Sequence, residues 1–168
     1  MDPPAYAGGT DHINCETMKI DGTHQLNISR ERVYALLVDP EVLRRCIPGC
    51  ESLEETQEHS YTATMKAGVG AIKGTFKGSV HLQDMRPPEH YRIIVEARGG
   101  PGFVKGSGDF DLEEQDGTTL IKYAGEMQVG GTIAAVGQRM IQAAAKMTAS
   151  QFFTRLEAEA KLNISSKQ

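Results

Sequence analysis

Apolar and polar residues alternate over long stretches in the middle of the chain. In the clearest run, residues 72–85, every second position from Ile72 to Leu82 is apolar or glycine, and the positions between them are polar. A period of two is typical of a β-strand that buries one face. Shorter runs of the same kind predict six further strands, over residues 19–28, 51–56, 60–67, 91–97, 104–112 and 118–129.

Turn and cap signals place the elements between these strands. Asp116-Gly117 is a strong hairpin turn, and glycine or proline clusters follow most of the other strands, which predicts a consecutive antiparallel meander. Ser29 is a helix cap ahead of residues 30–38, and Asp39-Pro40 begins a second short helix that stops at Pro48-Gly49. The pattern therefore predicts one strand, two short helices and then the remaining strands.

A long helix over residues 132–162 is the last predicted element, and Gly130-Gly131 separates it from the sheet. Apolar residues recur there at helical spacing, with charged residues on the other side. The expected buried stripe consists of Ile133, Val136, Met140, Ala144, Met147, Gln151 and Leu156, widened by Phe152 and Phe153.

The length of the chain, 168 residues, fits a single domain with a sizeable core. Residues 1–17 are rich in proline, glycine and polar residues and show no period, which predicts a disordered leader or an expression remnant. We expect the domain to occupy residues 18–162 and a short tail to occupy residues 163–168.

Charge and hydropathy exclude several classes of function. The net charge is −4 and the basic residues are interspersed with acidic ones, so we expect no nucleic-acid partner. No apolar run approaches the roughly 20 residues that a bilayer span requires. No secretion signal begins the chain, which predicts a cytoplasmic location.

Candidate catalytic and metal-binding residues are few. The five histidines lack ligand spacing, and Cys46 and Cys50 have no matching histidine pair, so we expect no metal and no cofactor. The inward positions of the predicted strands offer only Tyr61, Tyr91 and Tyr123 as polar groups, with no base beside a nucleophile, which favours a non-catalytic protein. The two cysteines fit a buried apolar pair at a tight turn, and they also fit a redox pair or a docking element.

One segment resembles the signature of a known family. Residues 42–53, Val-Leu-Arg-Arg-Cys-Ile-Pro-Gly-Cys-Glu-Ser-Leu, are similar to the carbon monoxide dehydrogenase G-subunit family. The residues that fit the same pattern are Gly74-Thr75-Phe76-Lys77-Gly78, Gln128-Val129-Gly130-Gly131, Gly137 and Gln151-Phe152-Phe153. The resemblance covers residues 18–156 and implies the α+β helix-grip fold of the START/Bet v 1-like superfamily. In that fold a curved antiparallel sheet wraps around a long C-terminal helix, and two short helices follow the first strand.

The resemblance also implies a function and partners. It implies an accessory role beside a molybdenum hydroxylase of the carbon monoxide dehydrogenase type, in which the protein carries an apolar molecule, quinone-like or lipid-like. It further implies recruitment of the enzyme to the membrane. We therefore expect a peripheral contact with the inner face of the membrane.

Small and large residues alternate on the predicted inward faces, which favours an internal cavity. Glycine at Gly74, Gly78, Gly106 and Gly108 removes side-chain volume and permits bends, and methionine supplies adaptable walls. The same pattern also fits a solid core in which methionine fills gaps. Loops 68–72 and 99–103 are expected to border the entrance or to be ordinary turns. The residues expected to contact the ligand are Tyr61, Met65, Phe76, Val80, Tyr91, Ile93, Phe103, Phe110, Tyr123, Met127, Val136 and Met140.

Three functions stay open at the level of the sequence. The first is the carrier of an apolar ligand. The second is a ligand-free maturation or docking protein that uses Arg44-Arg45 and the acidic segment 51–58. The third is an enzyme of the cyclase or hydrolase type, as in other helix-grip families, which would need a polar residue other than tyrosine inside the pocket.

Overall fold

The computed structural model describes the backbone of residues 15–69 and 71–166. Most of residues 1–17, the predicted leader, lies outside the described residues. Residues 15–17 belong to the first strand, where Cys15 pairs with Gly130. The elements in chain order are β1 (Cys15–Leu26), α1 (Arg30–Leu37), α2 (Pro40–Cys46), β2 (Cys50–Gln57), β3 (Ser60–Val69), β4 (Ile72–Arg86), β5 (His90–Gly99), β6 (Gly102–Gln115), β7 (Thr118–Gly130), the 3-10 helix η3 (Thr132–Val136) and α3 (Gln138–Ser166).

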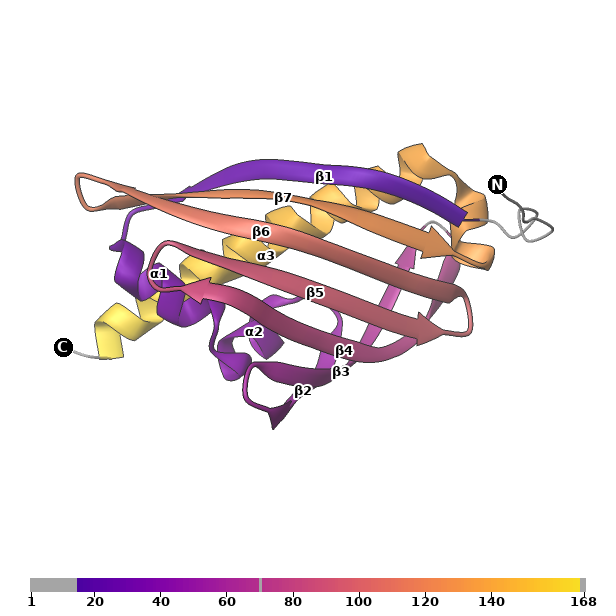
Figure 1. Ribbon diagram of the computed structural model, residues 1–168, viewed down its shortest axis with the longest axis horizontal. Coiled ribbons are helices and arrows are strands. Elements are labelled where there is room, and N and C mark those ends of the chain that lie inside the picture. Colours follow the sequence, from indigo (N-terminus) through magenta and orange to yellow (C-terminus); the bar gives the residue numbers. More distant parts are fainter. Residues whose placement is uncertain (1–14, 70, 167–168) are drawn as a thin grey trace.

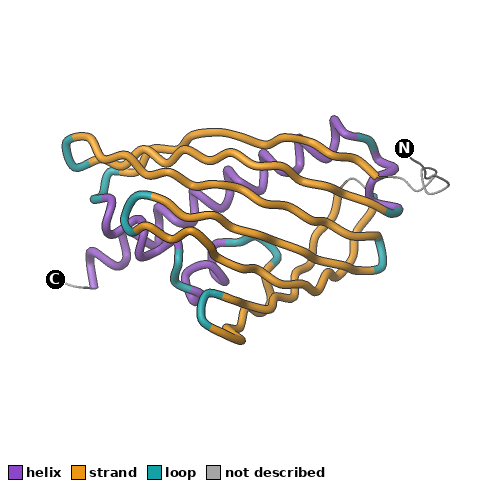
Figure 2. Tube along the Cα trace, viewed as in Figure 1, coloured by secondary structure: helices purple, strands orange, loops and turns teal. Residues whose placement is uncertain are grey.

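The strands form one antiparallel sheet in the order β1-β7-β6-β5-β4-β3-β2. Consecutive strands from β2 to β7 pair as a meander, and β1 returns to pair with β7. The sheet is curved, α3 crosses one of its faces, and α1 and α2 lie at one end of the molecule (Figure 1, Figure 2). The predicted architecture, a curved sheet around a long terminal helix with two short helices after the first strand, is confirmed.

The face of the sheet that is turned toward α3 is called the inner face below. The alternation predicted for the strands holds there, because Phe76 and Leu82 on β4, Tyr91 on β5 and Ile121 on β7 are all buried. The polar residues between them are on the outer face. The alternation of apolar and polar residues along these strands therefore predicted correctly which side chains face α3.

The long helix differs from the prediction at its beginning. Residues 132–136 form a 3-10 helix, and α3 begins at Gln138. Gly137 separates the two with a φ of 100°, a conformation that side chains other than glycine rarely adopt. The glycine therefore breaks what the apolar pattern predicted as one continuous helix over residues 132–162.

The buried face of α3 also differs from the predicted stripe. Met140 and Met147 are 46% and 63% exposed, whereas Ile141, Phe153 and Leu156 are 4%, 3% and 0% exposed. Gln151 is exposed as well. Alanine and methionine occur around much of this helix, so spacing alone permitted two neighbouring stripes, and packing against the sheet selected the second.

Buried residues form two separate clusters. The first joins α1, α2, the C-terminal half of α3 and one end of the sheet, and it includes Leu26, Val33, Leu37 and Leu156. The second lies at the other end, beneath η3 and the beginning of α3. It consists of Met18, Phe76, Val129, Ile133, Ala134 and Ile141. The stretch of inner face between these clusters positions the candidate site.

The turn between α2 and β2 explains why the Cys-Ile-Pro-Gly-Cys segment has a glycine at position 49. Gly49 has a φ of 81°, and its carbonyl accepts a hydrogen bond of 2.8 Å from the Lys66 amide. A methyl group on Gly49 would lie 2.1 Å from the Lys66 carbonyl oxygen. Only glycine therefore permits the close approach of this turn to β3.

Among the described residues, no helix combines the length and the apolar character that crossing a bilayer requires.

Candidate functional site

The middle of the inner face has a floor without side chains. Gly106 and Gly108 are inward positions of β6, where Gly108 is opposite Gly125 on β7 and Gly106 is opposite Val95 on β5. We call Gly106 and Gly108 the glycine floor. Two inward glycines in succession lower the height of the sheet surface just where it passes between the two core clusters.

What lies above an inward glycine differs along the sheet. The space above Gly22 is filled, because a methyl group there would lie 2.4 Å from the Tyr123 hydroxyl oxygen. Methyl groups on Gly106 and Gly108 would have their three nearest atoms in β7, beginning with the Glu126 carbonyl oxygen at 3.1 Å and the Ala124 carbonyl oxygen at 3.3 Å. No atom of α3 is among the three nearest neighbours of either methyl group, so β7 comes closer to the glycine floor than the helix does.

The apolar side chains around the glycine floor are only partly buried. Ile20, Met65 and Val95 point to the inner face, keep intermediate exposure and belong to neither core cluster. In a solid core such residues would be fully buried and would have close neighbours on every side. Their exposure marks the space between the two clusters as the place where the inner face is least completely covered.

A row of aromatic rings borders this space on the side of the first cluster. Tyr91 and Phe110 stack with centroids 4.9 Å apart, Phe110 and Tyr123 follow at 6.0 Å, and Tyr123 meets Phe153 of α3 at 5.4 Å. Tyr34 of α1 contacts Tyr91 edge-on at 5.7 Å. We call Tyr34, Tyr91, Phe110, Tyr123 and Phe153 the aromatic row. It joins the sheet to both helices and forms a rigid apolar wall.

Three inward tyrosines are among the polar groups of the region, together with His24 of β1, whose ring stacks on Phe153 with centroids 4.9 Å apart. Burial raises the pKa of Tyr61, Tyr91 and Tyr123, so these phenols stay protonated at neutral pH and can donate a hydrogen bond. Within the described part of the chain their hydroxyls form no hydrogen bond. The Tyr34 hydroxyl, by contrast, donates to the His90 carbonyl at 3.1 Å. Buried tyrosine hydroxyls usually have a partner, so these three are suited to a polar atom that the chain itself does not supply.

The structure brings ten of the twelve predicted ligand-contact residues to the interior. Nine are on the inner face of the sheet, and Val136 in η3 packs against the second cluster. Phe76 is part of that cluster, and Tyr61 and Tyr91 belong to the first. The nine on the sheet are Tyr61, Met65, Phe76, Val80, Tyr91, Ile93, Phe110, Tyr123 and Met127.

Phe103 and Met140 are elsewhere. Phe103 was expected in a loop, but β6 begins at Gly102 and its alternation turns Phe103 to the outer face. Arg98 and Lys105 lie over its ring, 5.5 Å and 5.7 Å from the centroid. Met140 is on the exposed side of α3. Neither side chain lines the space above the glycine floor.

Sequence reasoning passed over three residues of this region. Ile20 and Val95 lie within two of the predicted strands but were not expected to contact the ligand. Phe153 was expected only to widen the helix stripe, yet it joins the aromatic row. The period of two in the strands and the Phe152-Phe153 pair in the helix could have indicated these residues. How deeply each side chain is buried depends on the curvature of the sheet, which the sequence pattern does not contain.

Cys46 and Cys50 are free thiols at the end of α2 and the start of β2. Cys46 is 0% exposed, and burial raises its pKa to about 11, while burial also raises the pKa of Cys50. A thiol with a raised pKa holds little of the reactive thiolate at neutral pH. These features favour the buried apolar pair over the redox pair.

We therefore expect Cys46 to resist alkylation in the native protein. Iodoacetamide at pH 8 should label Cys46 at least about 100-fold more slowly than it labels the same residue in urea, because burial and the raised pKa both act against attack. Mass spectrometry of tryptic peptides measures this directly, and the partly exposed Cys50 provides the internal comparison. Labelling of Cys46 at the unfolded rate would restore the redox interpretation.

His90 lies among three carboxylates, an arrangement that the sequence did not indicate. Only 8% of His90 is exposed. Its Nδ1 lies 2.8 Å from Asp111 Oδ1, and its Nε2 lies 3.2 Å from Asp84 and 3.6 Å from Asp109. These residues lie on the outer face, where β4, β5 and β6 pair side by side. Within the part of the chain that the structure describes, no histidine, cysteine and carboxylate group is arranged to hold a metal ion.

A hollow of about 520 Å³ lies on the β3–β4 hairpin. Its lining residues are Lys66, Ala67, Gly68, Lys73, Gly74 and Thr75. The lysines and Thr75 are outward positions of their strands, so this hollow is separate from the space above the glycine floor.

Comparisons with known proteins assign the chain to a family and confirm its fold. A family model described as the carbon monoxide dehydrogenase G-subunit (CoxG) matches residues 22–161. A conserved protein from Geobacillus kaustophilus is 38% identical, with a TM-score of 0.83 over 86% of this chain and 95% of that one. No curated protein matches the chain.

More distant structures share the fold. The Zhui aromatase/cyclase from Streptomyces sp. R1128 is 13% identical, with a TM-score of 0.66 over 89% of this chain and 96% of that one. A protein from Thermus thermophilus is 16% identical, with a TM-score of 0.64 over 87% of this chain and 99% of that one. At this level of identity the likeness concerns the fold alone.

Proposed function

Because this chain belongs to the carbon monoxide dehydrogenase G-subunit (CoxG) family, we propose that it is a non-catalytic accessory protein that holds an apolar small molecule between its curved sheet and α3. Its partner is a molybdenum hydroxylase of the carbon monoxide dehydrogenase type, as the family name suggests. The ligand is quinone-like or lipid-like, and the protein works in the cytoplasm, at or near the inner face of the membrane.

The observation that carries this proposal is the incomplete burial of the apolar side chains around the glycine floor, between the two core clusters. An apolar molecule above Gly106 and Gly108 would contact the partly exposed Ile20, Met65 and Val95, which the protein alone does not bury. Burial of apolar area at about 25 cal/mol per Å² gives such contacts a favourable free energy. Sites for small molecules commonly combine an apolar lining with a few placed polar groups, and this surface has that composition.

The tyrosines suit a ligand that carries a carbonyl. Tyr123 is in the aromatic row, beside the glycine floor, and burial raises the pKa of its hydroxyl, so it remains a donor at neutral pH. A ring with carbonyl groups could stack along the aromatic row and accept from this hydroxyl. The same raised pKa makes the phenols poor general bases, which supports binding rather than catalysis.

The docking alternative rests on Arg44-Arg45, and the structure gives both side chains partners within the chain. Arg45 binds Glu159 of α3 with two hydrogen bonds of 2.9 Å and 3.0 Å, which raises the pKa of Arg45 and lowers that of Glu159. Arg44 lies 3.5 Å from Glu41. An arginine already engaged in this way is less available to a partner, so the carrier is the better-supported function.

Two measurements test the carrier. Organic extraction of the purified protein followed by mass spectrometry should recover an isoprenoid or lipid in a stoichiometric amount. Tyr123→Phe should then weaken binding of a soluble quinone with one isoprenoid unit by about 2- to 10-fold in calorimetric titration, as expected for one lost hydrogen bond. Its free energy of unfolding should stay unchanged, since the hydroxyl has no hydrogen bond within the described residues.

Tyr34→Phe is the matched control, because it removes the same atom from the same aromatic row. The Tyr34 hydroxyl is bonded to the His90 carbonyl, so its loss should cost about 1 kcal/mol of stability and leave quinone affinity unchanged. Empty extracts from several preparations, together with equal quinone affinity of the wild type and Tyr123→Phe, would contradict the carrier.

A further inference from the structure

The sheet has two free edges, and β1 forms one of them (Figure 1). An edge strand presents backbone N–H and C=O groups that can pair with another chain. Besides its pairing with β7, the β1 backbone has one hydrogen bond to another element among the described residues, from Gln138 Nε2 to the Thr17 carbonyl at 3.4 Å. Most of this edge therefore keeps its pairing capacity.

The two edges differ in the features that prevent strand pairing. β2, at the other edge, is 8 residues long, has two irregularities in its register with β3, and carries Glu51, Glu54 and Glu55. Short length, bulges and charged side chains are the usual protection of an edge strand. β1 is 12 residues long, contains no proline, and pairs with β7 without any irregularity. The β1 edge therefore lacks most of the protection that the β2 edge has.

The middle of the β1 edge has space beside it. A groove of about 120 Å³ lies along Lys19, Ile20 and Asp21, and Gln142 and Lys146 of α3 form its other side. The helix therefore does not fill the position that an added strand would take next to these three residues.

The side chains of β1 select one way for the strand to pair with a second copy of itself. Residues 17, 19, 21, 23 and 25 are all exposed, on the outer face. A twofold axis through Ile20 makes the two copies of β1 antiparallel and keeps this face continuous. Lys19 then lies opposite Asp21 of the second copy, and Thr17 lies opposite Thr23 of the second copy. Opposite charges and threonine pairs in these positions stabilise paired strands.

The neighbouring registers are unfavourable. An axis through Lys19 would place this lysine opposite its own copy, and an axis through Asp21 would place two carboxylates opposite each other. Like charges directly opposite destabilise a pair of strands. Neither Lys19 nor Asp21 forms an ion pair with another described residue, so both charges are available to a second copy. The strand is therefore self-complementary in the register centred on Ile20.

We propose that two copies of this chain pair through β1, antiparallel and centred on Ile20, to form a twofold-symmetric dimer with one continuous sheet. Ile20 borders the glycine floor and is partly exposed in the single chain. In the dimer it lies directly opposite its own copy on the inner face, so pairing adds apolar contact to the backbone hydrogen bonds and the two ion pairs. The dimer does not depend on the ligand proposed above.

Sedimentation velocity of the full chain tests the dimer. Between about 1 and 100 µM the wild type should shift from monomer toward dimer, as expected for a small interface. Lys19→Asp and Asp21→Lys each convert two attractive pairs into two repulsive ones, and each should weaken dimerisation by at least about 5-fold. The double variant Lys19→Asp/Asp21→Lys restores opposite charges in the same register, and its affinity should return to within about 2-fold of the wild type.

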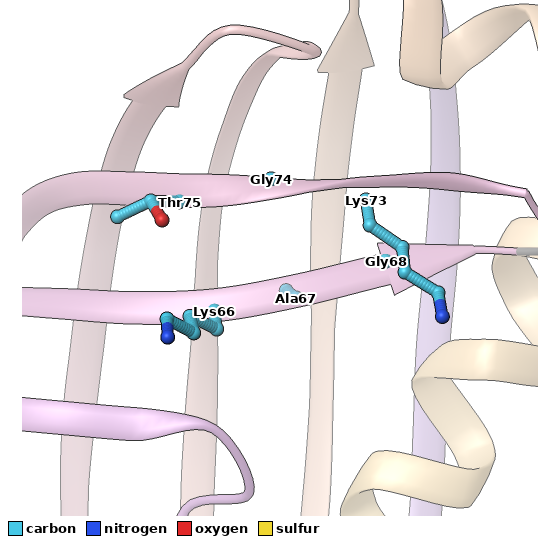
Figure 3. Close-up of a pocket in the computed structure, with 6 residues that line it drawn as sticks. All are labelled: Lys66, Ala67, Gly68, Lys73, Gly74 and Thr75. Carbon is cyan, nitrogen blue, oxygen red and sulfur yellow. The ribbon is translucent and has the colours of Figure 1, made fainter.

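Lys73→Asp is the matched control, because it makes the same change elsewhere on the outer face. Lys73 is in β4, which three strands separate from β1, and its side chain extends over the hollow of the β3–β4 hairpin (Figure 3). This variant should dimerise like the wild type. Circular dichroism should show that all four variants are folded.

A carbodiimide, which joins a lysine to a carboxylate in contact with it, tests the register directly. The wild type should yield a covalent dimer with a Lys19–Asp21 link, and neither single variant should yield it. A wild type that stays monomeric at 100 µM would overturn the proposal. A dimer that both single variants leave intact would overturn it too, because such a dimer uses another surface. If the double variant stayed as weak as the single ones, the register centred on Ile20 would be wrong.

Discussion

Leu156→Ala should lower the free energy of unfolding by about 2–5 kcal/mol, the usual cost of a large-to-small change in a core. Leu156 is 0% exposed and joins α3 to the first core cluster, so its loss would leave a cavity that the surrounding residues cannot easily fill. Urea denaturation followed by circular dichroism at 25 °C measures the change, and the midpoint should shift with little change in slope.

Met147→Ala is the control for this prediction. Met147 was part of the stripe that the sequence predicted to be buried, but it is 63% exposed in the structure. Its truncation should change the free energy of unfolding by less than about 0.5 kcal/mol. If Met147→Ala lowered the free energy of unfolding as much as Leu156→Ala, α3 would turn its other side to the sheet. Different helix residues would then lie above the glycine floor.

Val95→Phe should weaken the affinity for the quinone probe by at least about 10-fold. The free energy of unfolding should change little. Val95 points inward opposite Gly106, keeps intermediate exposure and belongs to neither core cluster. A phenyl ring there would extend over the glycine floor and occupy the space proposed for the ligand. If that space is open, the added volume should cost less than about 1 kcal/mol, below the usual penalty of an overpacked core.

Val129→Phe makes the same change where the core is closed. Val129 is 1% exposed within the second cluster, so the larger ring should cost about 1–3 kcal/mol or more. Denaturation of both variants beside calorimetric titration separates the outcomes. If Val95→Phe destabilised the protein as much as Val129→Phe, the middle of the inner face would be solidly packed, and the carrier proposal would fail.

The sequence could predict much of the candidate site but not its limits. A period of two assigned Tyr61, Tyr91 and Tyr123 to one face, because successive side chains of a strand point to opposite sides whatever the fold around them. It could not predict that Phe103 is already within β6 rather than in a loop, since the boundaries of a strand depend on pairing with its neighbours. It also could not predict the burial of His90, which follows from Asp84, Asp109 and Asp111 converging from two other strands.

By itself the sequence determined the order of the elements, the faces of the strands and the turn at Gly49, because each of these follows from local geometry and short-range periodicity. The tertiary structure alone decided which side of α3 is buried, how the core divides into two clusters, and that three carboxylates from two neighbouring strands gather around His90. These features depend on contacts between residues far apart in the chain, where the curvature of the sheet sets the distances that the sequence pattern does not contain.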